Sequence, residues 1–229
     1  MKRFDDKSTG TVGRSRRTFL KWSGSAVGII ALSGGFLPNF GISSAMAADL
    51  GAGDVGVLNY AYALEQLEAA FYTKAVDSPY GEMPDNEKQI LTEIRDHEVA
   101  HRDFLKKALA DKAIPDLEVD FSKVDFSKRE AVLTTAKTFE DLGVSAYNGA
   151  GKLIKNADYL LAAGRIVSVE ARHAAAIRDL LQPSSASFAG GDIINKNGLD
   201  AANPPAVVLK AAGPFIKTEI SANSIIGMN

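Results

Sequence analysis

Apolar residues recur at alternating spacings of three and four along four long segments of the chain. Such spacing is typical of amphipathic helices that bury one face in a helical bundle. The segments run from Val55 to Asp77, from about Pro84 to Ala110, from about Arg129 to Ile154 and from about Ala157 to Leu181. Asp54 is the expected N-cap of the first helix, because its carboxylate can accept backbone N–H groups of the first turn. The pattern therefore predicts an all-α fold built on four helices.

The connections between these segments predict how the helices are arranged. Short loops at 79–81 and 155–156 join the first helix to the second and the third to the fourth, which favours two antiparallel hairpins. The stretch 111–128 is long enough to cross along the bundle, and we expect its Phe121 and Phe126 to cover apolar surface. The predicted architecture is a four-helix bundle with a long crossover between helices two and three.

The helix seams are apolar at their ends and polar at their centres. The chain has only three histidines, and two of them stand three residues after a glutamate, in Glu98-x-x-His101 and Glu170-x-x-His173. Residues i and i+3 share one face of a helix, so each pair lies on the buried stripe. The third histidine, His97, is off the stripe and is expected at the surface or behind a ligand.

The other two helices also place carboxylates on the seam. Glu65 and Glu140 occupy the corresponding positions of the first and third helices. Glu68, one turn after Glu65, is an alternative ligand on the first helix, and it could also bridge two metals or pair with an arginine. Tyr72 and Tyr147 lie beside them, either bonded to the ligands or as ordinary core tyrosines.

A buried group of carboxylates needs positive charge. Burying one ionised carboxylate without a partner costs several kcal/mol, and neighbouring carboxylates also repel one another. No lysine or arginine occupies the seam positions to compensate. Two divalent metal ions would balance four carboxylates, and two neutral imidazoles would complete the set. Carboxylate oxygen with imidazole nitrogen suits iron or manganese, and zinc accepts the same ligands.

The motifs around these residues resemble those of bacterial secreted ferritin-like domain proteins, to which the desiccation-related proteins of plants are related. The resemblance lies in Leu64–Tyr72, Asp96–His101, Glu140–Tyr147 and Val169–His173, in that order, and it covers about Asp54 to Leu181. It implies a ferritin-like bundle whose dinuclear metal centre has these ligands: Glu65, Glu98, His101, Glu140, Glu170 and His173. That group is poorly defined functionally, so the resemblance implies no substrate, and we assign no catalytic residue.

The N-terminal segment predicts export. Ser15–Lys21 contains two consecutive arginines followed by Thr, Phe, Leu and Lys, and it resembles a twin-arginine signal. A weakly apolar stretch follows, and Ala45–Ala47 resembles a signal-peptidase site. A basic disordered tail and an uncleaved anchor are the alternatives. The expected parts are a signal peptide at 1–47, the bundle at 48–182 and a tail at 183–229 that packs on it.

This export signal implies a partner and a compartment. The twin-arginine machinery moves proteins that have already folded, often with a metal or cofactor inserted, so the chain is expected in the periplasm or outside the cell. The apolar stretch of the signal, interrupted by Gly and Ser, is too poor for a stable membrane span, which needs about 20 apolar residues.

Composition excludes several other classes. Without cysteine the chain has no disulfide, thiolate ligand or iron–sulfur cluster. Residues 48–229 carry 19 Lys/Arg against 26 Asp/Glu, and this acidic balance argues against binding to nucleic acid or to an anionic membrane.

Three functions remain open. The first is a metal-dependent redox protein that reacts with dioxygen, peroxide or iron, as an oxidase, a ferroxidase or a peroxide-degrading enzyme. The second is a structural or stress-protective bundle whose metal site is purely structural or empty. The third is a metal-storage protein assembled as a cage, and a homo-oligomer is compatible with the sequence. Small oxidants and metal ions are the expected ligands.

Overall fold

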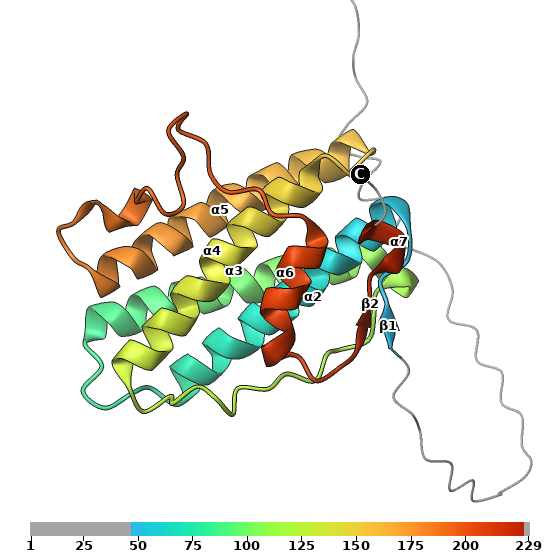
Figure 1. Cartoon of the computed structure of the whole chain (residues 1–229). Helices are drawn as coiled ribbons and strands as arrows, with labels where there is room; N and C mark the ends of the chain where they lie inside the picture. Colours follow the sequence, from blue (N-terminus) through green and yellow to red (C-terminus); the bar gives the residue numbers. More distant parts are fainter. Residues whose placement is uncertain (1–46, 227–229) are drawn as a thin grey trace, which may run out of the picture. The chain divides into compact units, whose positions relative to one another are not determined.

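The computed structural model describes residues 47–226 of the chain (Figure 1). The segment expected to be an export signal lies outside the described residues, except for Ala47. Most of the described chain is helical, which confirms the predicted all-α fold. The four long helices are α2 (Gly53–Asp77), α3 (Asp85–Leu109), α4 (Arg129–Gly151) and α5 (Ala157–Leu181).

These helices form two hairpins laid against each other. Helix α2 packs along α3, and α4 packs along α5. Contacts of α2 with α4 and of α3 with α5 join the two pairs into one bundle. The seam positions at the bundle centre are buried, as the periodicity predicts. Within residues 47–226, no helix is both long and apolar enough to cross a membrane.

Asp54 does not have the predicted role of N-cap. Helix α2 begins at Gly53, and its N-cap is Ala52, which offers no side-chain acceptor. Asp54 lies in the first turn, where its two carboxylate oxygens accept the backbone N–H groups of Lys155 at 2.8 Å and of Asn156 at 2.9 Å. It therefore fastens the loop between α4 and α5 to the start of α2, a contact that local sequence rules cannot predict.

The third helix is shorter than its periodicity predicts. Helix α4 ends at Gly151 rather than at Ile154. The N–H groups of Leu153 and Ile154 bond to carbonyls three residues back, at 2.9 and 3.2 Å, so the chain leaves the helix in a tighter turn. Asn156 then caps α5 by accepting two backbone N–H groups of its first turn.

The crossover between α3 and α4 covers apolar surface, as predicted. It starts with a 3₁₀ turn, η2 (Ala110–Lys112), and continues as irregular chain with turns at 122–123 and 126–127. The rings of Phe121 and Phe126 are buried and contact Phe71 of α2, with centroid distances of 5.7 and 5.6 Å. The crossover is therefore part of the core at one end of the bundle.

The tail runs back over the bundle and reaches the start of the described chain. Its Asn203 crosses α4 at Gly149, where a Cβ atom would lie 1.8 Å from the Asn203 carbonyl oxygen, so glycine is required. Phe215 packs edge-on against Phe139 of α4, with 4.8 Å between ring centroids. The tail elements are η3 (Ala186–Ala189), α6 (Pro205–Ala212), η4 (Gly213–Phe215), β2 (Ile220–Ser221), which pairs in parallel with β1 (Ala48–Asp49), and α7 (Asn223–Ile226).

Candidate metal centre

The structure brings all six predicted ligands together at the centre of the bundle. The four carboxylates are fully buried, and the side chains of His101 and His173 are 13% and 5% exposed. Each helix contributes at least one of these residues, because the polar positions of the four seams lie at the same level. The set consists of Glu65 from α2, Glu98 and His101 from α3, Glu140 from α4, and Glu170 and His173 from α5.

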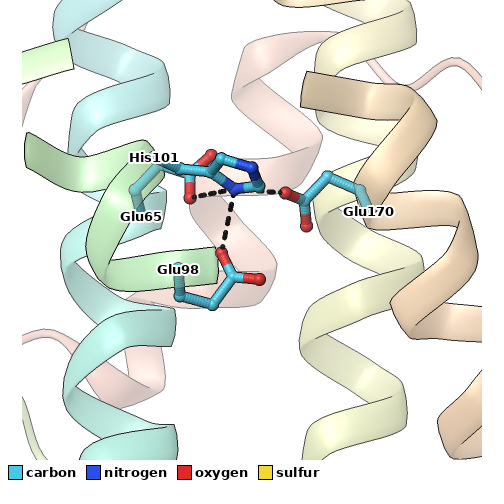
Figure 2. A group of neighbouring side chains, drawn as sticks. All are labelled: Glu65, Glu98, His101 and Glu170. Atoms are coloured by element: carbon cyan, nitrogen blue, oxygen red, sulfur yellow. Dashed lines mark ion pairs between the residues drawn. The ribbon is translucent and has the colours of Figure 1, made fainter. Parts of the chain in front are cut away.

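The potential ligand atoms form two groups, each compact enough to surround one cation. Within each group the atoms lie within 4.8 Å of one another. Site A consists of Glu65, Glu98, His101 and Glu170 (Figure 2). Site B consists of Glu98, Glu140, Glu170 and His173. Two glutamates, Glu98 and Glu170, therefore belong to both sites.

In site A the carboxylates surround one imidazole nitrogen. Nδ1 of His101 lies 2.9 Å from Oε1 of Glu170, 3.4 Å from Oε2 of Glu65 and 3.5 Å from Oε2 of Glu98. Figure 2 shows these contacts converging from α2, α3 and α5. A single small cation placed among these atoms would be within reach of side chains from three helices.

Site B repeats the arrangement with the other oxygens of the shared glutamates. Nδ1 of His173 lies 2.7 Å from Oε1 of Glu98, 3.5 Å from Oε2 of Glu140 and 3.9 Å from Oε2 of Glu170. Glu98 and Glu170 thus turn one oxygen toward each histidine. Carboxylates placed in this way can bridge two cations.

Among the described residues, the atoms that face the two sites lie close to one another but have no partner with hydrogen-bond geometry. They are Oε2 of Glu65 and of Glu140, both oxygens of Glu98 and of Glu170, and Nδ1 of both histidines. Buried polar atoms are normally hydrogen-bonded, so this concentration of unpaired donor atoms fits a site that binds cations. Arg178 is also buried, but its guanidinium pairs with Asp141 and Asp192 rather than with the cluster.

The remaining oxygens of the two unshared glutamates are held by tyrosines. Tyr147 of α4 donates its hydroxyl to Oε1 of Glu65, and Tyr72 of α2 donates to Oε1 of Glu140, both at 2.5 Å. Of the two interpretations left open by the sequence, the structure supports tyrosines bonded to the candidate ligands. Each tyrosine leaves Oε2 of its glutamate directed to a site.

Without cations, the histidines are held in their charged form. Burial lowers the pKa of His101, but the close carboxylates of Glu170 and Glu65 outweigh it and raise that pKa to about 12. The same competition, with Glu140 as the main opposing group, raises the pKa of His173 to about 10. The imidazolium ions therefore supply part of the positive charge that metal ions would bring.

Burial shifts the pKa values of most of the carboxyl groups upward, which favours their neutral form. Burial raises the pKa of Glu65 to about 8, raises that of Glu140, and raises those of Glu68 and Glu170 well above the usual range. Glu98 is the exception, because the two histidines outweigh its burial and lower its pKa to about 2. The metal-free centre thus holds protons that cations would displace.

Glu68 is a fifth buried carboxylate that belongs to neither site. A Cβ atom on Gly143 would lie 3.1 Å from Oε1 of Glu68 and 3.6 Å from Oε2 of Glu170, so Glu68 lies close to a shared glutamate. The structure places Glu65, and not Glu68, beside His101.

His97, which the sequence places at the surface or behind a ligand, is exposed and also contacts a candidate ligand. Nδ1 of the exposed His97 lies 2.9 Å from Nε2 of His173, and the two rings are stacked with centroids 5.2 Å apart. His97 is off the seam of α3, so helical periodicity alone gives no signal for this contact with α5. Its position next to Glu98 in the chain indicates a place behind a ligand but does not indicate that its partner is His173.

A family model of the ferritin-like domain matches residues 53–183, more than half of the 229 residues. The chain belongs to the ferritin-like domain family. No curated protein matches its sequence. The ferritin-like region begins with α2 and ends two residues beyond α5, so it contains both sites and excludes the tail.

The donor set of this ferritin-like bundle fits metal ions. Four carboxylates and two imidazoles turn unpaired atoms toward sites A and B. Two of the carboxylates belong to both sites. Neutral imidazole and ionised carboxylate are the forms that bind metals, and both become available once the bound protons leave. The cluster can therefore hold cations without rearrangement of the helices.

A small apolar cavity adjoins site A. Its volume is about 20 Å³, and its walls come mainly from α2, α4 and α5. Leu64 and Tyr147 line it, and the hydroxyl of Tyr147 donates to Glu65. A cavity of this size holds about one water-sized molecule.

Proposed function

We propose that this ferritin-like protein holds a dinuclear iron or manganese centre that reduces a small oxidant, dioxygen or peroxide. The observation that carries the proposal is the sharing of Glu98 and Glu170, each with one oxygen toward each site. When bound, two such ions would supply one electron each in passing from +2 to +3, enough, with two protons, to convert one dioxygen into hydrogen peroxide or one hydrogen peroxide into two waters.

The residues of the chain have separate tasks in this proposal. Glu65 and His101 would hold one ion, Glu140 and His173 would hold the other, and the shared glutamates would serve both. The tyrosine hydroxyls fix the outer oxygens of the two unshared glutamates. Because the carboxylates are fully buried, the charges of the centre act in a region of low dielectric constant.

The cavity beside site A supports a small substrate. It offers about 20 Å³ and is lined by apolar side chains and aromatic rings. Dioxygen and peroxide match this size, whereas a larger organic substrate does not. His101 is the most exposed of the six candidate ligands, so this end of the cluster is the proposed point of approach.

We also propose that the protein is exported by the twin-arginine machinery with its ions already bound, to the periplasm or beyond. The proposal is supported by the string Ser15–Lys21 and the small residues at 45–47. It agrees with the burial of the centre, because ions bound in a fully buried site would travel with the folded bundle. Membership of the bacterial secreted branch of the family, related to the desiccation proteins, belongs to the same proposal.

A structural role for the ions is the second candidate. It is favoured by one observation: the carboxylates have no exposed surface, and the cavity beside them is small. In that case the ions would only hold the four helices together, as expected for a stress-protective bundle.

Metal analysis of the protein purified from the export compartment tests both candidates. We expect about two redox-active metals per chain, loss of both in Glu98→Ala, loss of one in His173→Ala, and retention of both in a control, Glu93→Ala, at an exposed position of α3. Consumption of dioxygen or peroxide by the loaded protein would support the redox function. Bound metal without any such reaction would favour the structural role, and wild-type protein without metal would exclude both.

A further inference from the structure

Resting on the proposed metal centre, we propose that His97 is a positioning residue for site B. It accepts the Nε2–H of His173 and thereby directs Nδ1 of His173 to the cation. His97 itself does not belong to either group of candidate ligands.

The two nitrogens of His173 face different surroundings. Nδ1 lies 2.7 Å from Oε1 of Glu98 inside the cluster, while Nε2 lies 2.9 Å from Nδ1 of His97 at the edge of the bundle. A neutral imidazole that binds a cation through Nδ1 must carry its hydrogen on Nε2. That hydrogen needs an acceptor, and Nδ1 of His97 is placed to accept it.

An acceptor at this position also fixes the orientation of the ring. Histidines that bind metals almost always donate their second N–H to another group, which sets the tautomer and strengthens the ligand. His97 comes from α3 and His173 from α5, so the hydrogen bond joins the two helices that contribute histidines. It therefore holds the imidazole of site B in place before any cation enters.

Site A has no such support. Over residues 47–226, no hydrogen bond is made by Nε2 of His101, whose side chain is also the more exposed of the two. The two sites have similar carboxylates, but only the histidine of site B has a hydrogen-bond partner for its Nε2 among the described residues. Loss of the His97 acceptor should consequently weaken one cation site and spare the other.

The alternative role for His97 is packing. Its ring is stacked on that of His173 with an interplanar angle of 11°. Two substitutions separate the two roles. His97→Phe keeps an aromatic ring but removes the acceptor, whereas His97→Asn keeps an acceptor near the position of Nδ1 but removes the ring.

Titration of the metal-free full-length protein with Mn²⁺, followed by the electron paramagnetic resonance signal of the free ion, tests the proposal. In His97→Phe we expect one of the two Mn²⁺ ions to bind about 10–100-fold more weakly, with the other unchanged. In His97→Asn both ions should bind as in the wild type. His97→Phe leaves the Nε2–H of the buried His173 without its acceptor, so its metal-free form should melt below the wild type, whereas metal-free His97→Asn should melt close to it.

Each other result is decisive. Wild-type affinity for both ions in His97→Phe would overturn the proposal while leaving the metal centre intact. Weak binding in His97→Asn with normal binding in His97→Phe would assign His97 to packing. Failure of the wild type to bind two Mn²⁺ ions would reject the metal centre, and the role of His97 with it.

Discussion

The hydroxyl of Tyr147 on α4 donates to Oε1 of Glu65 on α2, at 2.5 Å. The opposite pair, Tyr72 on α2 and Glu140 on α4, has the same distance. In both helices the tyrosine follows the glutamate by seven residues, about two turns. The tyrosine of each helix therefore donates a hydrogen bond to the glutamate of the other helix. This reciprocal pairing leaves one oxygen of each glutamate directed to a cation site.

Tyr147→Phe should destabilise the protein by about 1–3 kcal/mol, because it leaves a buried carboxyl oxygen without its donor. The matched control is Tyr60→Phe on α2, since the Tyr60 hydroxyl is buried with no partner among the described residues. Its removal should be neutral or stabilising. Urea unfolding of the metal-free proteins measures both, and an equal effect of the two substitutions would contradict the role of Tyr147.

The metal-free protein should lose stability as the pH rises from about 5 to about 9. Glu65, with its pKa raised to about 8, keeps in the folded state a proton that the unfolded chain releases near 4.5. His101 and His173, with pKa values of about 12 and 10, keep protons that the unfolded chain releases near 6.5. The folded state binds more protons throughout this range, so stability falls with pH. Glu98, with its pKa lowered to about 2, acts oppositely but only below about pH 4.5.

Metal ions should reverse this dependence, because they displace the same protons and bind more tightly as the pH rises. The measurement is the melting temperature with and without Mn²⁺ in matched buffers. The difference between the two curves cancels titration elsewhere in the protein. It should grow from about pH 5 to about pH 9, and a difference that shrinks with pH would show that protons do not compete with the ions.

The sequence was sufficient to predict the bundle and its centre because both depend on helical periodicity. The seams fix which faces meet, and Glu98 and Glu170 share a face with the histidines three residues later. Because burying unpaired carboxylates is unfavourable, the same positions also predict cations at the centre of the bundle. The fold is confirmed, and the six predicted residues do meet at one place, with Glu65 rather than Glu68 beside His101.

Contacts between distant segments could not be predicted in this way. His97 is off its own seam, and its partner lies on another helix. Asp54 satisfies a local rule for an N-cap, but the loop at 155–156 competes for its carboxylate. The tail crosses α4 at Gly149, and nothing in the tail's own composition indicates this course. Each of these contacts depends on where a second segment lies, which local patterns do not encode.

Gly143→Ala should weaken metal binding without unfolding the bundle. The added Cβ would lie 3.1 Å from Oε1 of Glu68, so this side chain must move by a few tenths of an ångström beside Glu170. The control, Gly164→Ala in α5, has no atom within 4 Å of the new Cβ and should stabilise the helix by about 0.5–1 kcal/mol. Mn²⁺ affinity and melting temperature measure the two effects. Unchanged affinity in Gly143→Ala would mean that Glu68 plays no part in the centre.

The shared and unshared glutamates should differ in how many ions depend on them. Glu98→Gln removes a carboxylate that faces both histidines, so the binding of both ions should be weakened. Glu140→Gln should weaken binding at site B alone, and Glu65→Gln should weaken binding at site A alone. Glutamine keeps the volume of the side chain, so the helices should remain packed and the effect isolates the charge. Mn²⁺ titration counts the ions that remain: none bound tightly in Glu98→Gln and one in each of the other two. Equal loss in all three variants would show that the centre binds its ions as one unit rather than at two separable sites.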